Sequence, residues 1–357
     1  MSLDAEFRPA WASPPNETLR ELMHRKGLPK AVLASVLGVA ESELTRTLDG
    51  ELPIDDARAE RLAAQIGGSP RFWLTREAQY RQALKTIHDD ARAWVSSLPF
   101  GDMAKFGWLK AASTFAEKIS HAFAFFDVSS VDEWRDAWLS EHAGLTAYRT
   151  SPVFNAQAAA TAAWLRQGEL AASHIRVAQW SRANFECLIP ELKPLTRIHR
   201  PSEFLQRLQQ ECAACGVAVV IVRAPKGCTA SGATRFTAGQ AILQLSARYL
   251  RDDSFWFTFF HEAGHLVLHE DRLFLEWSEK RHLDEQEELE ASDFAGKVLI
   301  PPSQEAALRA LPHEYKSIMR FARDLSVSPG IVVGQLQHRG LLPRDKLNFL
   351  KKRYTWD

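Results

Sequence analysis

The most informative stretch of the chain is Phe255-Trp-Phe-Thr-Phe-Phe-His261-Glu262-Ala-Gly-His265-Leu-Val-Leu268. It is apolar almost throughout, which predicts a buried helix. Residues four apart share a face of a helix, so His261 and His265 can bind one metal ion, with Glu262 beside the open coordination position. An unpaired carboxylate is costly in so apolar a helix, and this favours a chemical role for Glu262.

A third metal ligand is expected downstream, in an acidic segment with helical spacing that contains Glu287, Glu288 and Glu290. Two histidines, one carboxylate and a water form the hydrolytic arrangement of Zn²⁺. The alternative for each of these acids is a place on the solvent-exposed face of the helix, without contact to a metal. Because several acids are adjacent, most of them must lie on that face. His269 lies about 12 Å along the helix from His261, too far for one zinc ion. A structural or substrate-side role suits His269 better.

Two strands and three helices are predicted around this segment. The strands are 217–223 and 241–246, and the helices are 254–270, 284–299 and 312–325. The second strand precedes the metal helix, so it could lie along the cleft and pair with an extended substrate. Its substrate-side residues would be Ala241, Leu243 and Leu245. The alternative is an ordinary core strand.

The C-terminal part resembles the ImmA/IrrE family of zinc metallopeptidases over about residues 195–345. The motifs that carry the resemblance are FTFFHEAGHLVLH, the acidic helix ELEASDFA and Leu299-Ile-Pro301. The resemblance implies a small zincin-like α+β domain with a short sheet, a Zn²⁺ cofactor and Glu262 as general base. It implies His261, His265 and Glu288 as ligands, with Glu290 as second choice. Ser292 stands where the family has Asn, which weakens the support of a metal ligand unless a neighbour such as Asp293 substitutes.

The first 95 residues predict a five-helix bundle, because Gly or Pro breaks each helical segment. Residues 30–48 have the spacing of a helix-turn-helix, with the tight turn at Gly38. The exposed face of the second helix would carry Glu41, Ser42, Thr45 and Arg46 toward a DNA major groove. The residues expected to bind DNA are Lys30, Ser42, Thr45 and Arg46. The alternative is a plain helical bundle.

Several motifs in order make this N-terminal part resemble antitoxin-type repressors of the HigA class, within the larger phage-repressor-like family. They are Pro15-Asn-Glu17-Thr-Leu19, Asp49-Gly50, Pro53-Ile54 and Ser69-Pro70-Arg-Phe72-Trp73-Leu74. Residues 1–90 contain 12 Lys and Arg against 14 Asp and Glu, a balance of −2. Phosphate contacts need basic side chains, so DNA affinity per head should be weak. Proteins of this kind usually compensate for weak affinity per head by binding a palindromic operator as a homodimer.

Composition limits the remaining classes of protein. The chain has 44 basic and 44 acidic residues, which excludes a general nucleic-acid-binding coat. The sequence shows no membrane span or signal peptide, and four cysteines are too few for a disulfide framework, so we expect a cytoplasmic protein. The expected fold is mainly α, with an N-terminal helix-turn-helix domain (1–93), an all-α middle domain (94–194) and the metallopeptidase domain (195–357).

Together these features predict a DNA-binding transcriptional regulator whose zinc peptidase cleaves a repressor-type or antitoxin-type protein, or the chain itself. The family resemblances place such cleavage in a stress, phage-defence or toxin–antitoxin response. One alternative is a repressor or antitoxin whose zinc domain only senses or dimerises. Another is a regulated peptidase whose head docks a protein partner instead of DNA.

Overall fold

The computed structural model describes residues 15–49, 51–140, 155–237, 240–246, 251–269, 274–277 and 285–355. It divides into two compact units, one formed by residues up to Trp94 with 130–132, the other by 95–129 with 133–357. Gly50 lies outside the described residues. So do residue 270, the last of the helix expected at 254–270, and residue 284, the first of the helix expected at 284–299. The three domain ranges expected from the sequence remain a prediction.

The first unit is built from short helices, as the Gly and Pro breaks predict. They are α1 (Pro15–Arg25), α2 (Lys30–Leu37), α3 (Glu41–Leu48), α4 (Asp56–Ile66) and most of α5 (Pro70–Ser97). The turn between α2 and α3 falls at Gly38, which adopts φ 64°. The apolar faces of α2 and α3 meet in one buried core that includes Leu33, Leu44 and Trp73.

The second unit begins with helices that carry a cluster of large aromatic residues. They are α6 (Phe100–Lys105), α7 (Phe115–Phe126), α8 (Val131–Arg135, whose first two residues belong to the first unit), the π-helix η1 (Asp136–Ser140), α9 (Ala156–Ala172), α10 (Arg182–Leu188), the 3-10 helix η3 (Ile189–Arg197) and α11 (Pro201–Ala213). Phe126 packs edge-on against Trp134 and Trp138. Every described element between 94 and 194 is helical, which confirms the expected all-α middle region.

A four-stranded sheet lies at the centre of the second unit. The strands are β1 (Val217–Ile221), β2 (Ala230–Thr237), β3 (Gln240–Leu245) and β4 (Phe274–Trp277), in the order β1-β3-β2-β4. β1 runs parallel to β3, and β2 runs antiparallel to β3 and β4. Strands β2 and β4 were not predicted from the sequence, because neither has the β-branched, apolar run that marked the other two.

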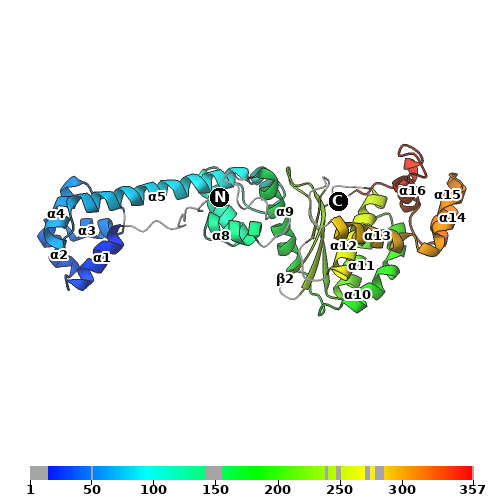
Figure 1. Cartoon of the computed structure of the whole chain (residues 1–357), viewed down its shortest axis with the longest axis horizontal. Helices are drawn as coiled ribbons and strands as arrows, with labels where there is room; N and C mark the ends of the chain where they lie inside the picture. Colours follow the sequence, from blue (N-terminus) through cyan, green and yellow to red (C-terminus); the bar gives the residue numbers. More distant parts are fainter. Residues whose placement is uncertain are drawn as a thin grey trace. The chain divides into compact units, whose positions relative to one another are not determined.

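Helix α9 covers one face of this sheet and α12 (Asp252–Leu268) the other (Figure 1). Polar contacts attach α9: Gln244 of β3 donates to the carbonyl of Trp164 at 2.7 Å, and Trp164 donates to the carbonyl of Val222 at 2.8 Å. Arg235 of β2, also buried, donates to the carbonyl of Leu165 at 2.6 Å. Burial lowers the pKa of Arg235 to about 10, so it remains charged at neutral pH.

The elements after α12 complete the second unit. They are α13 (Glu285–Leu299), the 3-10 helix η4 (Pro302–Gln304), α14 (Glu305–Arg309), α15 (Tyr315–Asp324), α16 (Pro329–His338) and the 3-10 helix η5 (Asn348–Leu350). The expected mainly α fold with a small α+β C-terminal part is confirmed. Within the part of the chain that the structure describes, none of the helices combines the length and apolar character needed to span a membrane.

Candidate metal centre

Helix α12 brings two imidazoles together in the protein interior. His261 and His265 are both buried, and their Nε2 atoms are 3.1 Å apart. The close approach follows from their spacing, since residues four apart lie one above the other on a helix. Two ring nitrogens that converge in this way present their lone pairs to one point, which suits a shared cation.

Helix α13 supplies the carboxylate. Glu288 lies with Oε2 at 3.2 Å from Nε2 of His261 and Oε1 at 3.4 Å from Nε2 of His265. The donor atoms of these three residues lie within 4.8 Å of one another, the one group of potential metal ligands of this kind in the described part of the chain. Histidine nitrogens and a carboxylate in this number form the protein part of a catalytic zinc site. The donor set therefore fits a zinc ion.

Small residues allow α13 to approach α12 so closely. A Cβ atom at Gly264 would lie only 3.3 Å from the Cα of Ala291 and 3.1 Å from Cδ1 of Phe294. Larger side chains at Gly264 or Ala291 would push the helices apart and withdraw Glu288 from the histidines. The small residues in the two motifs are thus explained by helix packing.

The electrostatics keep the donor groups in metal-binding form. Burial lowers the pKa of His265, which favours the neutral imidazole. Burial raises the pKa of Glu288, but hydrogen bonds from His261 and His265 outweigh this and bring it to about 2. Metal ligands must be deprotonated, and at neutral pH both residues are.

Ser292 supports one of the two histidines. Its Oγ lies 3.2 Å from Nδ1 of His261, the ring nitrogen that faces away from the donor cluster. Such a contact orients a metal-binding imidazole. Asp293, considered above as a substitute, instead pairs with Lys297 at 2.5 Å on the exposed side of α13. Ser292 itself therefore occupies the supporting position.

The carboxylate of Glu262 lies against strand β2. The side chain is fully buried. A Cβ atom at Gly232 of β2 would lie 2.3 Å from Oε1 of Glu262, so only glycine leaves room for the carboxylate there. Gly232 was not predicted as a site residue, since its only signal in the sequence is one glycine in a segment with a weak strand pattern.

The second-choice ligand and the third histidine lie apart from this cluster. Glu290 Oε2 is 3.7 Å from Nε2 of His269, and Glu290 accepts a hydrogen bond from Gln286 at 2.7 Å. His269 follows the end of α12, with its ring 5.6 Å from that of His265. The structure thus groups Glu288, and not Glu290, with His261 and His265.

The predicted substrate strand is contradicted by the sheet. Ala241, Leu243 and Leu245 belong to β3, which pairs with β1 on one side and β2 on the other. An interior strand has no unpaired edge to offer a peptide, so β3 is a core strand. Among the described strands, β1 and β4 are the outer ones.

The predicted DNA-contact residues lie on the first unit. Lys30 on α2 and Ser42 and Arg46 on α3 are exposed, and Thr45 is half-buried. The Nε of Arg46 lies 3.1 Å from the carboxylate of Glu51, so this cation is paired within the head.

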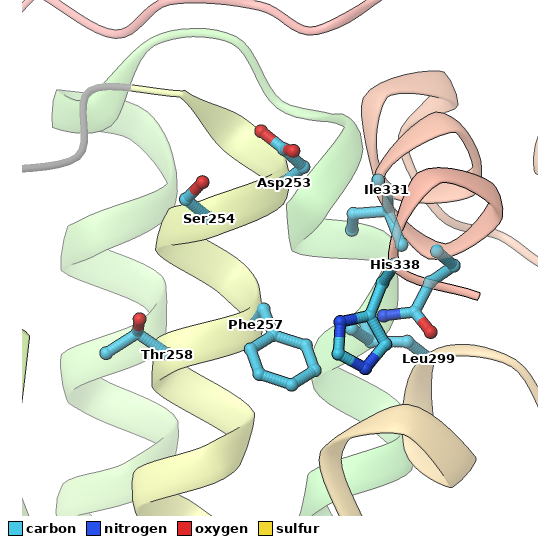
Figure 2. Close-up of a pocket in the computed structure, with 9 residues that line it drawn as sticks. Asp253, Ser254, Phe257, Thr258, Leu299, Ile331 and His338 are labelled. Carbon is cyan, nitrogen blue, oxygen red and sulfur yellow. The ribbon is translucent and has the colours of Figure 1, made fainter. Parts of the chain in front are cut away.

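A pocket of about 230 Å³ lies between α12 and α16, and none of the three donor residues lines it. Figure 2 shows Phe257 and His338 side by side at its lower end, between α12 and α16. Phe257 lies one turn before His261 on α12. The centroid of its ring is 6.3 Å from the ring centroid of His261 and 6.3 Å from that of His338. Leu299 and Ile331 add apolar side chains to the lining, and Asp253, Ser254, Thr258 and Gln335 add polar ones.

Comparison with known families agrees with this geometry. Residues 216–337 match the family model described as Peptidase_M78, the IrrE N-terminal-like domain. The match begins just before β1 and ends in α16, so it includes the sheet, α12 and α13. It indicates a peptidase of metallopeptidase type for this part of the chain. A search of curated proteins finds no match.

Proposed function

We propose that this protein is a zinc-dependent peptidase and transcriptional regulator, in which a DNA-binding head is joined to a domain that cleaves a repressor-type or antitoxin-type protein or the chain itself. The observation that carries the peptidase part is the convergence of His261, His265 and Glu288 beside the buried Glu262. The match to a peptidase family over the same residues supports it.

The chemistry follows from the side chains around the donor cluster. A zinc ion held by His261, His265 and Glu288 would supply Lewis acidity and lower the pKa of a bound water toward neutrality. Glu262 accepts a proton from the attacking water and passes it to the leaving amine of the peptide. The protein around Glu262 excludes bulk water, so the carboxylate exchanges its proton with the reacting groups.

The regulatory part rests on the first unit and on the family resemblances. Exposed Lys30, Ser42 and Arg46 on two short helices joined by a tight turn support contact with a DNA operator. The acidic balance of residues 1–90 supports a homodimer on a palindromic site. The substrate class, and a stress, phage-defence or toxin–antitoxin setting, are carried over from the resemblances.

A second candidate is a peptidase whose head docks a protein partner. Arg46 is paired with Glu51, and Val32 and Val36 expose about half of their surface one turn apart on α2. Paired charge and exposed apolar surface favour contact with protein over contact with phosphate.

One experiment separates the two candidates. The wild type and the Glu262→Gln variant are each expressed in the source cells under stress, and the new protein N-termini that appear are compared. In a second measurement, each purified protein selects DNA from a random pool. We expect new N-termini only with the wild type and the same selected palindrome with both. Cleavage without a selected sequence would favour the docking head. New N-termini that also appear with Glu262→Gln would exclude the proposed peptidase centre.

A further inference from the structure

A second cavity of the C-terminal unit lies away from the metal centre. It has a volume of about 780 Å³ and is formed by α15, the start of α16, η5 and the chain near residues 197–199 and 352. It shares no lining residue with the metal cluster or with the pocket along α12. Small-molecule sites have volumes of roughly 300–1,000 Å³, so this one can accept a nucleotide-sized ligand.

The lining of this cavity is basic. Its nitrogen-bearing side chains are Arg197, His199, Lys316, Arg320, Arg323 and Lys352, and no acidic residue is among the described residues that line it. An acid touches the rim, where the Oδ1 of Asp324 lies 3.5 Å from the Nε of Arg323. The remaining cations leave a clear excess of positive charge, which attracts an anion.

Three of these cations form a row on one helix. Lys316, Arg320 and Arg323 are spaced by four and three residues on α15, which places them on one face. At 1.5 Å per residue the row extends about 10 Å, the length of a chain of phosphates and not of a single carboxylate.

Lys352 faces the row from a fixed backbone. Its N–H donates to Oδ1 of Asp252 at 2.9 Å, and its carbonyl accepts from the N–H of Asp252 at 2.9 Å. The Nζ of Lys352 donates to Nε2 of His199. Burial and the charge of Lys352 lower the pKa of His199, so this imidazole is neutral at pH 7. The cavity wall is therefore organised before any ligand arrives.

Two aromatic rings stand exposed at the same cavity. The ring centroids of Tyr315 and Phe349 are 6.4 Å apart with planes 20° from parallel. Phe349 is 72% exposed, the highest value among the large apolar residues of the described chain. An exposed flat ring beside a basic groove is the arrangement that stacks nucleobases in single-strand-binding proteins.

We propose that this cavity binds a nucleoside phosphate, with the base stacked on Tyr315 and Phe349 and the phosphates on the basic row of α15. The ligand is either a free nucleotide or an unpaired stretch of nucleic acid, since both present the same base and phosphate groups. Paired bases are already stacked on their neighbours, so a duplex offers no free ring face. The site lies outside the N-terminal head and needs no metal.

The test measures binding of a fluorescein-labelled six-nucleotide oligothymidylate to the full-length protein by fluorescence anisotropy. ATP, inorganic tripolyphosphate and a DNA duplex are the competitors. We expect Phe349→Ala and Arg320→Gln each to weaken binding of the probe about tenfold or more. Phe349→Trp keeps an aromatic ring at this position and should retain binding. Arg207→Gln, at an exposed arginine outside the cavity, should leave this binding unchanged. Arg46→Ala is measured in parallel to detect any binding of the probe by the head.

The competitors identify the source of the ligand. ATP that displaces the probe at equal or lower concentration indicates a nucleotide site, whereas a much tighter oligonucleotide indicates a nucleic-acid strand. Tripolyphosphate as effective as ATP, with no effect of Phe349→Ala, would overturn the proposal in favour of a simple basic surface. Probe binding lost only with Arg46→Ala would overturn it in favour of the head. Zinc content, measured on the same samples, reports separately on the metal centre.

Discussion

Ser292 and His261 are connected across two helices: Oγ of Ser292 on α13 lies 3.2 Å from Nδ1 of His261 on α12. The same helix α13 carries Glu288 to the opposite side of that imidazole. Both ring nitrogens of His261 therefore contact residues of α13. The packing of α13 on α12 both orients this ring and adds the third donor, Glu288.

The first prediction concerns metal content. His261→Ala or His265→Ala should abolish stoichiometric zinc, because each removes one of three donors, whereas Glu262→Gln should retain it. Elemental analysis of the purified proteins measures this directly. Full zinc content in both histidine variants would show that the metal binds elsewhere, and loss in Glu262→Gln would make Glu262 a ligand.

The second prediction concerns the carboxylate donor. Glu288→Ala should weaken zinc binding by at least about tenfold, as even the loss of a supporting partner does. Glu290→Ala should have a much smaller effect, since Glu290 lies beside His269. Competition with a zinc chelator ranks the two variants. The reverse ranking would mean that the register of α13 differs by two residues.

The third prediction concerns Ser292. Removal of the hydroxyl in Ser292→Ala should reduce zinc affinity by about 10-fold to 100-fold, the range for lost support of a metal ligand. Ser292→Asn should retain most of the affinity, because an amide oxygen can accept from the same ring N–H. Asp293→Asn is the matched control on the exposed side of the helix. Equal affinities for Ser292→Ala and the wild type would make the contact with His261 irrelevant to the metal.

The fourth prediction concerns Gly232. In Gly232→Ala the new methyl group overlaps Oε1 of Glu262, which should destabilise the protein by about 1–3 kcal/mol. Thermal unfolding measures the loss. Gly296→Ala on α13 is the control, because a Cβ at this position would meet no atom within 4 Å apart from its chain neighbours and the backbone of its own helix, and it should be neutral or slightly stabilising. An unchanged melting temperature in Gly232→Ala would mean that the Glu262 carboxylate lies elsewhere.

The fifth prediction concerns the head. Arg46→Ala should cost about 1–3 kcal/mol in operator binding if the side chain contacts guanine, and should reduce the salt slope by about one if it contacts phosphate. Binding must first release Arg46 from Glu51, so Glu51→Gln should strengthen DNA binding modestly. Titration of a selected operator at several salt concentrations tests both variants. No change with Arg46→Ala would remove this residue from the interface.

The sequence by itself determined the helix that carries His261, Glu262 and His265, because ligand spacing and apolar context are both local properties of one segment. It also predicted the breaks between the N-terminal helices, since Gly and Pro act on the backbone where they stand. These features need no knowledge of distant residues.

Only the tertiary structure decided which acid faces the histidines, because Glu288 and Glu290 share one segment and differ in which side of α13 packs on α12. It also made β3 an interior strand, since the neighbours of a strand come from β1 and β2 elsewhere in the chain. The cavity of Lys316, Phe349 and Lys352 likewise joins segments whose sequences carry no common motif. Contacts between segments distant in sequence follow from packing of the whole fold, and local patterns do not encode them.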